Sequence, residues 1–152
     1  MMPRRARGAA LTLGVALEYT LPMPGPRLMV VEDEEEVRAV WVEALEEAGY
    51  TVHGFAVGTD ALAGLSELRP DLILLDMMMP GMDGYEFLAR LRANPASAGI
   101  PLLIVSAVGE SLSMSIDTRG ARTLGVAGIL AKPLNLATLI EHVERVVGPA
   151  RA

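Results

Sequence analysis

Residues 71–84 read DLILLDMMMPGMDG. Its first part, residues 72–75, is continuously apolar, and the carboxylate of Asp76 follows directly. An unbroken apolar run of this length is typical of a central strand in a parallel sheet, because helices cover both faces of such a strand. We therefore predict a buried strand with Asp76 at its carboxyl end.

Outward from this strand, short apolar runs alternate with amphipathic stretches from Arg27 onward, which indicates strand and helix units feeding a parallel sheet. The predicted strands are residues 28–31, 51–55, 72–75, 102–105 and 128–130. The predicted helices are residues 37–48, 60–68, 85–92, 118–124 and 135–147, the last with Asn135 as its N-cap and Gly148 as its end. The fold class is therefore α/β.

The length of 152 residues and the apolar content of 51% fit one ordinary domain with a real core. We expect this domain to span residues 26–148. Residues 1–25 are predicted to be an N-terminal extension, either irregular or an overlong gene start, because Glu18 interrupts the apolar stretch that would otherwise resemble a signal peptide. Residues 149–152 form a tail too short for an output domain.

Charge and cysteine content exclude several classes of function. The formal charge is −6, and no run of basic residues follows the first few positions, so electrostatic binding of nucleic acid is not expected. The chain has no cysteine and therefore no disulfides or thiolate zinc site, which favours the cytoplasm. No apolar run approaches the roughly 20 residues that a membrane span needs.

Three acids follow two of the predicted strands. Glu32 and Asp33 come after the first strand and Asp76 after the third, and ligands of parallel sheets bind beyond the carboxyl ends of the strands. Two such charges about 4 Å apart would repel by roughly 4 kcal/mol at an effective dielectric near 20, and a hard divalent cation relieves this. Asp33, Asp76 and a backbone carbonyl suit Mg²⁺, with Glu32 acting through water. Alternatively, acids at these positions only stabilise the following helix, because their negative charge lies near its positive N-terminal end. This explanation is sufficient for the glutamates at residues 34–36.

The same edge is predicted to receive a hydroxyl and an ammonium group. The fourth strand leads to Ser106 and the fifth delivers Lys132, which is the only lysine beside twelve arginines. Taken singly, a serine there is an ordinary turn residue and a lysine is an ordinary solvated one. Taken with the acids, they are the groups that a bound phosphoryl group needs.

Four fragments in this order and spacing resemble receiver domains of two-component response regulators, which are CheY-like. They are residues 30–34 (VVEDE), 71–84, 104–107 (IVSA) and 131–133 (AKP). The resemblance covers residues 27–147. It implies a flavodoxin-like, doubly wound sheet of five parallel strands in the order 2-1-3-4-5, with five helices.

By this resemblance, Asp76 is the phosphoacceptor, and Mg²⁺, with Mn²⁺ as a second choice, is held by Asp33, Asp76 and the backbone carbonyl of Met78. Glu32 would act on the metal through water. Ser106 is implied to be the switch hydroxyl. The remaining implied features are Lys132 as the cation that pairs with the phosphate and a cis peptide bond between Lys132 and Pro133.

The function implied is that of a stand-alone response regulator, which accepts a phosphoryl group from a sensor histidine kinase or phosphotransfer protein and switches a surface for an unknown downstream protein. Such a domain is a phosphoacceptor that catalyses its own phosphorylation and slow dephosphorylation rather than a conventional enzyme. A phosphatase or phosphotransferase with an aspartyl intermediate would want a second acid two residues after Asp76, where Met78 stands. Neither nucleic acid nor membrane is an expected partner.

Three features depart from the receiver pattern. Ile129 stands where receivers commonly carry Tyr or Phe, and the segment between Ser106 and Lys132 is longer than is usual. Met78 and Val108 are apolar and cannot orient an attacking water, so we expect a slowly hydrolysing phosphoaspartate. The first two departures leave an alternative open, a receiver-like interaction module that works without phosphorylation.

Overall fold

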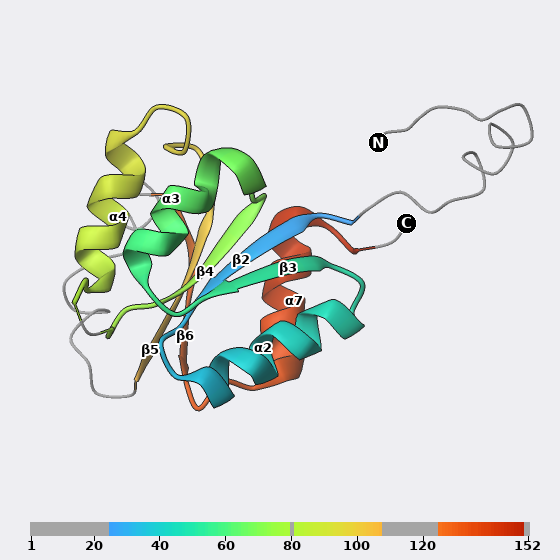
Figure 1. Cartoon of the computed structure of the whole chain (residues 1–152). Helices are drawn as coiled ribbons and strands as arrows, with labels where there is room; N and C mark the ends of the chain where they lie inside the picture. Colours follow the sequence, from blue (N-terminus) through green and yellow to red (C-terminus); the bar gives the residue numbers. More distant parts are fainter. Residues whose placement is uncertain (1–24, 80, 108–124, 151–152) are drawn as a thin grey trace, which may run out of the picture.

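Five parallel strands form one sheet in the order β3-β2-β4-β5-β6 (Figure 1). The computed structural model describes residues 25–79, 81–107 and 125–150. The strands are β2 (Arg27–Val31), β3 (Thr51–Phe55), β4 (Leu72–Asp76), β5 (Leu102–Ala107) and β6 (Val126–Lys132). Counted along the chain, this order is 2-1-3-4-5, as predicted.

Helices cover both faces of the sheet. They are α2 (Glu35–Glu47), α3 (Gly58–Leu68), α4 (Gly84–Ala93) and α7 (Leu136–Val147). In Figure 1, α2 and α7 lie on one face and α3 and α4 on the other. These are four of the five predicted helices, and the remaining one, residues 118–124, lies outside the described residues. None of the helices in the described ranges is long and apolar enough to cross a membrane.

The core consists of two buried layers because successive strand residues point to opposite faces of the sheet. The layer beneath α2 and α7 contains Leu28, Val30, Trp41, Leu45, Leu72, Leu74, Leu103, Val105, Leu139 and Val143. The layer beneath α3 and α4 contains Met29, Val31, Ala61, Ile73, Leu75, Phe87, Leu91 and Ile104. All five residues of β4 are buried, which explains the unbroken apolar run that decided the fold.

Helix ends follow the capping chemistry of the sequence. The side chain of Asn135 accepts a hydrogen bond from the backbone N–H of Thr138 at 3.0 Å, as expected for the N-cap of α7. Asp83 caps α4 in the same way, through the N–H of Glu86 at 2.9 Å. Gly148 ends α7 with a φ of 84°, a left-handed value that glycine adopts without strain.

Strand lengths were underestimated for the last two strands. The predicted range 128–130 lies inside β6, and β5 extends to Ala107, beyond the predicted end at 105. The parallel ladder continues through Ser106 paired with Ala131 and Ala107 paired with Lys132. The prediction followed apolar side chains, whereas the backbone pairing extends through small and polar residues.

Candidate functional site

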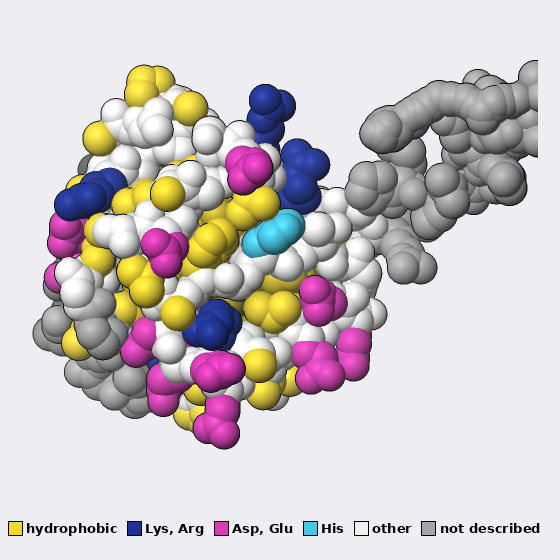
Figure 2. All heavy atoms as spheres, viewed as in Figure 1, with side chains coloured by type: hydrophobic (Ala, Val, Ile, Leu, Met, Phe, Trp, Pro, Cys, Tyr) yellow, Lys and Arg dark blue, Asp and Glu magenta, His cyan; other side chains and the backbone are white. Residues whose placement is uncertain are grey.

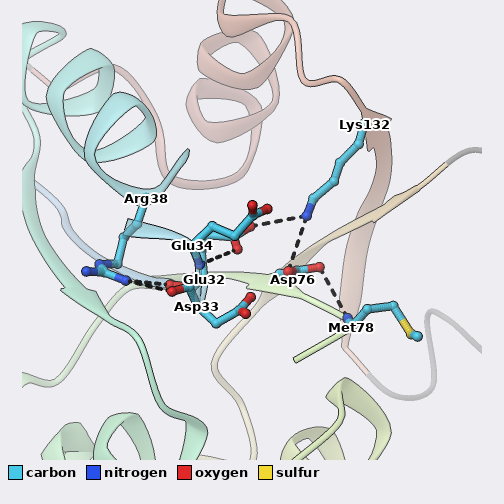
Figure 3. Close-up of polar contacts among 7 residues, drawn as sticks. All are labelled: Glu32, Asp33, Glu34, Arg38, Asp76, Met78 and Lys132. Atoms are coloured by element: carbon cyan, nitrogen blue, oxygen red, sulfur yellow. Dashed lines mark hydrogen bonds and ion pairs between the residues drawn. The ribbon is translucent and has the colours of Figure 1, made fainter. Parts of the chain in front are cut away.

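The carboxyl ends of β2 and β4 lie side by side, since Val31 pairs with Leu75. The residues that follow, Glu32 and Asp76, therefore lie at the same edge of the sheet. Carboxylate oxygens of Glu32, Asp33 and Asp76 all lie within 4.8 Å of one another (Figure 3). The structure thus brings together the three acids that the sequence singled out.

Lys132 points at this cluster from the end of β6 (Figure 3). Its Nζ lies 3.2 Å from Oδ2 of Asp76 and 3.3 Å from Oε1 of Glu32. Both carboxylates are buried, with exposed side-chain fractions of 2% and 0%. Burial by itself would lower the pKa of Lys132, but the negative charges of Asp76 and Glu32 beside it outweigh burial and raise that pKa. The ammonium therefore stays charged.

The carboxylate of Glu32 is fully buried. Burial raises its pKa from 4.5 to about 7, against the opposing effect of a hydrogen bond from the N–H of Glu34 to Oε2 at 3.0 Å. The charge of Asp76 raises this pKa further, and that of Lys132 lowers it. Although Oε1 forms the ion pair with Lys132, it accepts no hydrogen bond from the described residues. A buried oxygen in this state fits a cation or a metal-bound water.

Asp76 is held from two sides. Besides its contact with Lys132, its Oδ1 accepts a hydrogen bond from the backbone N–H of Met78 at 3.2 Å. The side chain of Met78 is 63% exposed, so this residue meets the site through its backbone. Its carbonyl remains a predicted metal ligand. The carboxylate of Asp76 is thus oriented before any donor arrives.

Arg38 was missed by the sequence reasoning. From the first half of α2 its Nη1 donates to the carbonyl oxygens of Glu32 at 2.8 Å and Asp33 at 3.5 Å, which fixes the connection that carries both acids. Gly54 on β3 makes room for it, because a Cβ there would lie 3.2 Å from Cδ of Arg38. The available signal was a single arginine among the glutamates of this helix.

Residues 28–144 match the family model of the response regulator receiver domain. The chain belongs to the response regulator receiver family. This match spans every acid of the site, together with Ser106 and Lys132. Receiver domains of this family bind Mg²⁺ in an acidic pocket, and the described residues contain a buried acidic cluster of the matching kind.

Similar proteins include transcriptional regulatory proteins and a phosphotransferase. The receiver is 34% identical over 126 residues to the phosphate regulon transcriptional regulatory protein PhoB of Rhizobium meliloti, covering 83% of this chain and 54% of that protein. It is 32% identical over 123 residues to sporulation initiation phosphotransferase F of Bacillus subtilis, covering 81% and 94%. The chain spans about half the length of the transcriptional regulators that it matches.

Solved structures of receivers superpose on this one. A putative response regulator from Chloroflexus aurantiacus has a TM-score of 0.71 at 30% identity, covering 82% of this chain and 98% of that one. The chemotaxis protein CheY4 of Vibrio cholerae has a TM-score of 0.70 at 30% identity, covering 80% and 98%. The flavodoxin-like receiver fold is therefore shown by structure as well as by sequence.

The remaining receiver positions lie on β5 and β6. Ser106 is buried, and it follows Val105, the partner of Asp76 in the ladder, so it belongs to the same sheet edge. The cis peptide bond between Lys132 and Pro133 is present. Ile129, at the position where receivers commonly have an aromatic residue, is 38% exposed.

Proposed function

We propose that this receiver accepts a phosphoryl group on Asp76 from a sensor histidine kinase or phosphotransfer protein, in a reaction that depends on Mg²⁺. The observation that carries the proposal is the convergence of three carboxylates within 4.8 Å, with the ammonium of Lys132 touching two of them. The proposal concerns the receiver domain, predicted at residues 26–148, in the cytoplasm.

The metal would be held by Asp33 and Asp76, by the carbonyl of Met78, and by Glu32 through a water molecule. Mn²⁺ would fit the same oxygen ligands. The Oε1 atom of Glu32, buried and accepting no hydrogen bond from the described residues, supports this role. Bound Mg²⁺ would neutralise charge on the oxygens of the phosphoryl group in transfer.

The chain itself would supply nucleophile, orientation and charge. A carboxylate oxygen of Asp76 forms the new bond to phosphorus while the bond from phosphorus to the donor histidine nitrogen breaks. The N–H of Met78 and the ammonium of Lys132 hold Asp76 from both sides, so little reorientation precedes the attack. Lys132 then offers its positive charge to the new phosphoryl oxygens.

Signalling would follow from the hydroxyl of Ser106. Phosphorylation adds acceptor oxygens beside the end of β4, and Ser106 stands on the neighbouring strand β5. A hydroxyl drawn toward these oxygens would move the end of β5 and change the surface presented to a downstream protein. Ile129 offers no aromatic ring to accompany this movement.

We expect proteins rather than nucleic acid as the partners of this domain. Acidic side chains lie along the solvent face of α2 (Figure 2), where Glu35, Glu36, Glu43, Glu46 and Glu47 are exposed. Such a surface repels the phosphate backbone of DNA or RNA. DNA binding by the longer transcriptional regulators among its relatives is therefore not carried over to this domain.

One observation favours a second candidate, a receiver-like module that binds its partner without phosphorylation. Ile129 exposes an aliphatic side chain where receivers commonly turn an aromatic ring inward. Under this alternative the acidic cluster would be structural and Asp76 would stay unmodified.

Incubation with acetyl phosphate, with Mg²⁺ or with EDTA, followed by intact mass spectrometry separates the two candidates. The proposal expects one added phosphoryl group, only with Mg²⁺, and none in Asp76→Asn. Asp83→Asn is a matched control because it makes the same chemical change outside the cluster and keeps an N-cap oxygen for α4. A wild-type chain that gains no mass with Mg²⁺ would leave only the phosphorylation-independent module.

A further inference from the structure

We propose that Trp41 is a positioning residue for Lys132, holding the ammonium group against the face of its indole ring. The Nζ atom of Lys132 lies over this ring, 5.9 Å from its centroid. The contact joins the middle of α2 to the end of β6, two elements far apart in the chain. Its kinetic consequence rests on the proposed function, but the contact itself does not.

The ring is well placed to act as a fixed support. Trp41 is 3% exposed and belongs to the buried layer beneath α2 and α7, so its orientation is set by the packing of the core. Lys132, by contrast, has a flexible four-carbon stem, and its side chain is 27% exposed. The rigid partner therefore restricts the mobile one.

The position in which the ammonium of Lys132 is held matters for the site. Glu32 and Asp76 attract the ammonium from the carboxylate side, at 3.3 and 3.2 Å. The negative face of the indole ring attracts it as well, without neutralising either carboxylate. Lys132 is thus kept beside Asp76 while the carboxylates stay available to a cation and a phosphoryl donor.

The separation of 5.9 Å is at the outer end of the range for cation–π contacts, so the expected effect is modest. We expect Trp41→Leu to slow phosphorylation by acetyl phosphate about two- to fivefold, in line with a weak contact of this kind. Trp41→Phe keeps an aromatic face and should retain most of the wild-type rate.

A purely structural role for Trp41 would give a similar loss through general destabilisation, so the matched control is Leu45→Ala. Leu45 lies one helical turn further along α2 and is fully buried in the same layer. The Leu45→Ala change should lower the unfolding temperature at least as much as Trp41→Leu, yet leave the phosphorylation rate of the folded protein unchanged.

The contact can be measured directly by NMR, because Lys132 is the only lysine of the chain and Trp41 its only tryptophan. The 152-residue chain labelled with ¹³C at lysine Cε gives one methylene signal, which the ring should shift upfield. We expect this shift to vanish in Trp41→Leu, to persist in part in Trp41→Phe, and to remain in Leu45→Ala.

An unchanged lysine signal in both Trp41 variants would overturn the proposal, as would a Leu45→Ala protein that loses the shift equally. Should Trp41→Leu fail to fold, the lysine signal of Trp41→Phe still decides the matter, because a shift as large as that of the wild-type chain would overturn the proposal. A wild-type protein that shows the upfield shift but accepts no phosphoryl group would refute the proposed function while leaving the contact with Lys132 intact.

Discussion

The two halves of the sheet edge differ in how tightly they are built. At the ends of β2 and β4, the acidic half, Glu32 and Asp76 are buried and each accepts a backbone hydrogen bond. At the ends of β5 and β6, the readout half, Ser106 is buried but Ile129 is partly exposed and replaces an aromatic residue. The acids of the first half match the receiver pattern, although Met78 after β4 departs from it, and Ile129 departs from it in the second half. Lys132 links the two halves, because it reaches the acids of the first half from the end of β6 in the second.

The largest expected effect is a change of the unfolding free energy with pH, caused by the buried carboxylate of Glu32 in the acidic half. The pKa of Glu32 is raised to about 7 in the folded chain from 4.5, so the folded state binds this proton more tightly than the unfolded state. The corresponding stability is fully present below about pH 4.5 and is lost as the pH rises through about 7. Without metal, the unfolding free energy should fall by about 2–3 kcal/mol between about pH 5 and 8 through this group alone.

Urea unfolding in EDTA at both pH values measures this effect, with Glu32→Gln as the comparison because its side chain cannot titrate. The wild-type chain should lose about 2–3 kcal/mol more than the variant over this interval. Equal losses of unfolding free energy in the two proteins would mean that folding does not raise the pKa of Glu32.

Asp33→Asn is expected to weaken Mg²⁺ binding by about 10- to 100-fold or more, since even indirect partners of metal ligands contribute on this scale. Isothermal titration with MgCl₂ gives the affinity. Glu34→Gln is the neighbouring control, because Glu34 is exposed and meets Glu32 through its backbone N–H. Similar Mg²⁺ affinities for Asp33→Asn and the wild-type chain would remove Asp33 from the metal site.

The sheet and the gathering of the acids could be predicted because both follow from local patterns. A continuously apolar run implies a central strand, and parallel strands deliver the residues after them to one edge, so Asp33 and Asp76 had to meet once their strands paired. The meeting of these acids does not depend on where the side chains of the helices lie.

Arg38 and Trp41 could not be found in this way. Their roles depend on where α2 sits against the sheet: Arg38 reaches backbone carbonyls that carry no sequence signal, and Trp41 meets a lysine on a strand far along the chain. The predicted strand at 128–130 was too short because pairing continues through Ala131 and Lys132, which the apolar pattern does not mark. The predicted helix at 118–124 and the longer connection around it lie outside the described residues.

A smaller effect is expected on the lifetime of the phosphoryl group. Met78 and Val108, the latter outside the described residues, carry no polar side-chain group that could assist an attacking water. The Met78→Asn, Val108→Glu double variant should therefore lose its phosphoryl group about tenfold faster, because a positioned polar group assists such steps. Decay after removal of acetyl phosphate, followed by intact mass, measures it. A wild-type lifetime no longer than that of the variant would reject the idea.

The smallest effect is expected for Ile129→Tyr in the readout half. Because Ile129 is partly exposed, the change in unfolding free energy should stay within about 0.5 kcal/mol, and the rate of phosphorylation should not change. Timed phosphorylation with acetyl phosphate and urea unfolding check both points. A several-fold change in the phosphorylation rate would show that the two halves are coupled more closely than their structures suggest.

If the acidic cluster makes Asp76 a phosphoacceptor, reductive trapping should locate the phosphoryl group on this residue. Borohydride reduces an aspartyl phosphate to homoserine, so protein treated with acetyl phosphate and Mg²⁺ and then with borohydride should contain homoserine at position 76 by peptide mass mapping. The account predicts this residue there and at no other acid of the cluster. Homoserine at Asp33 or at the nearby Asp83, or none in a folded protein with Mg²⁺ present, would contradict it.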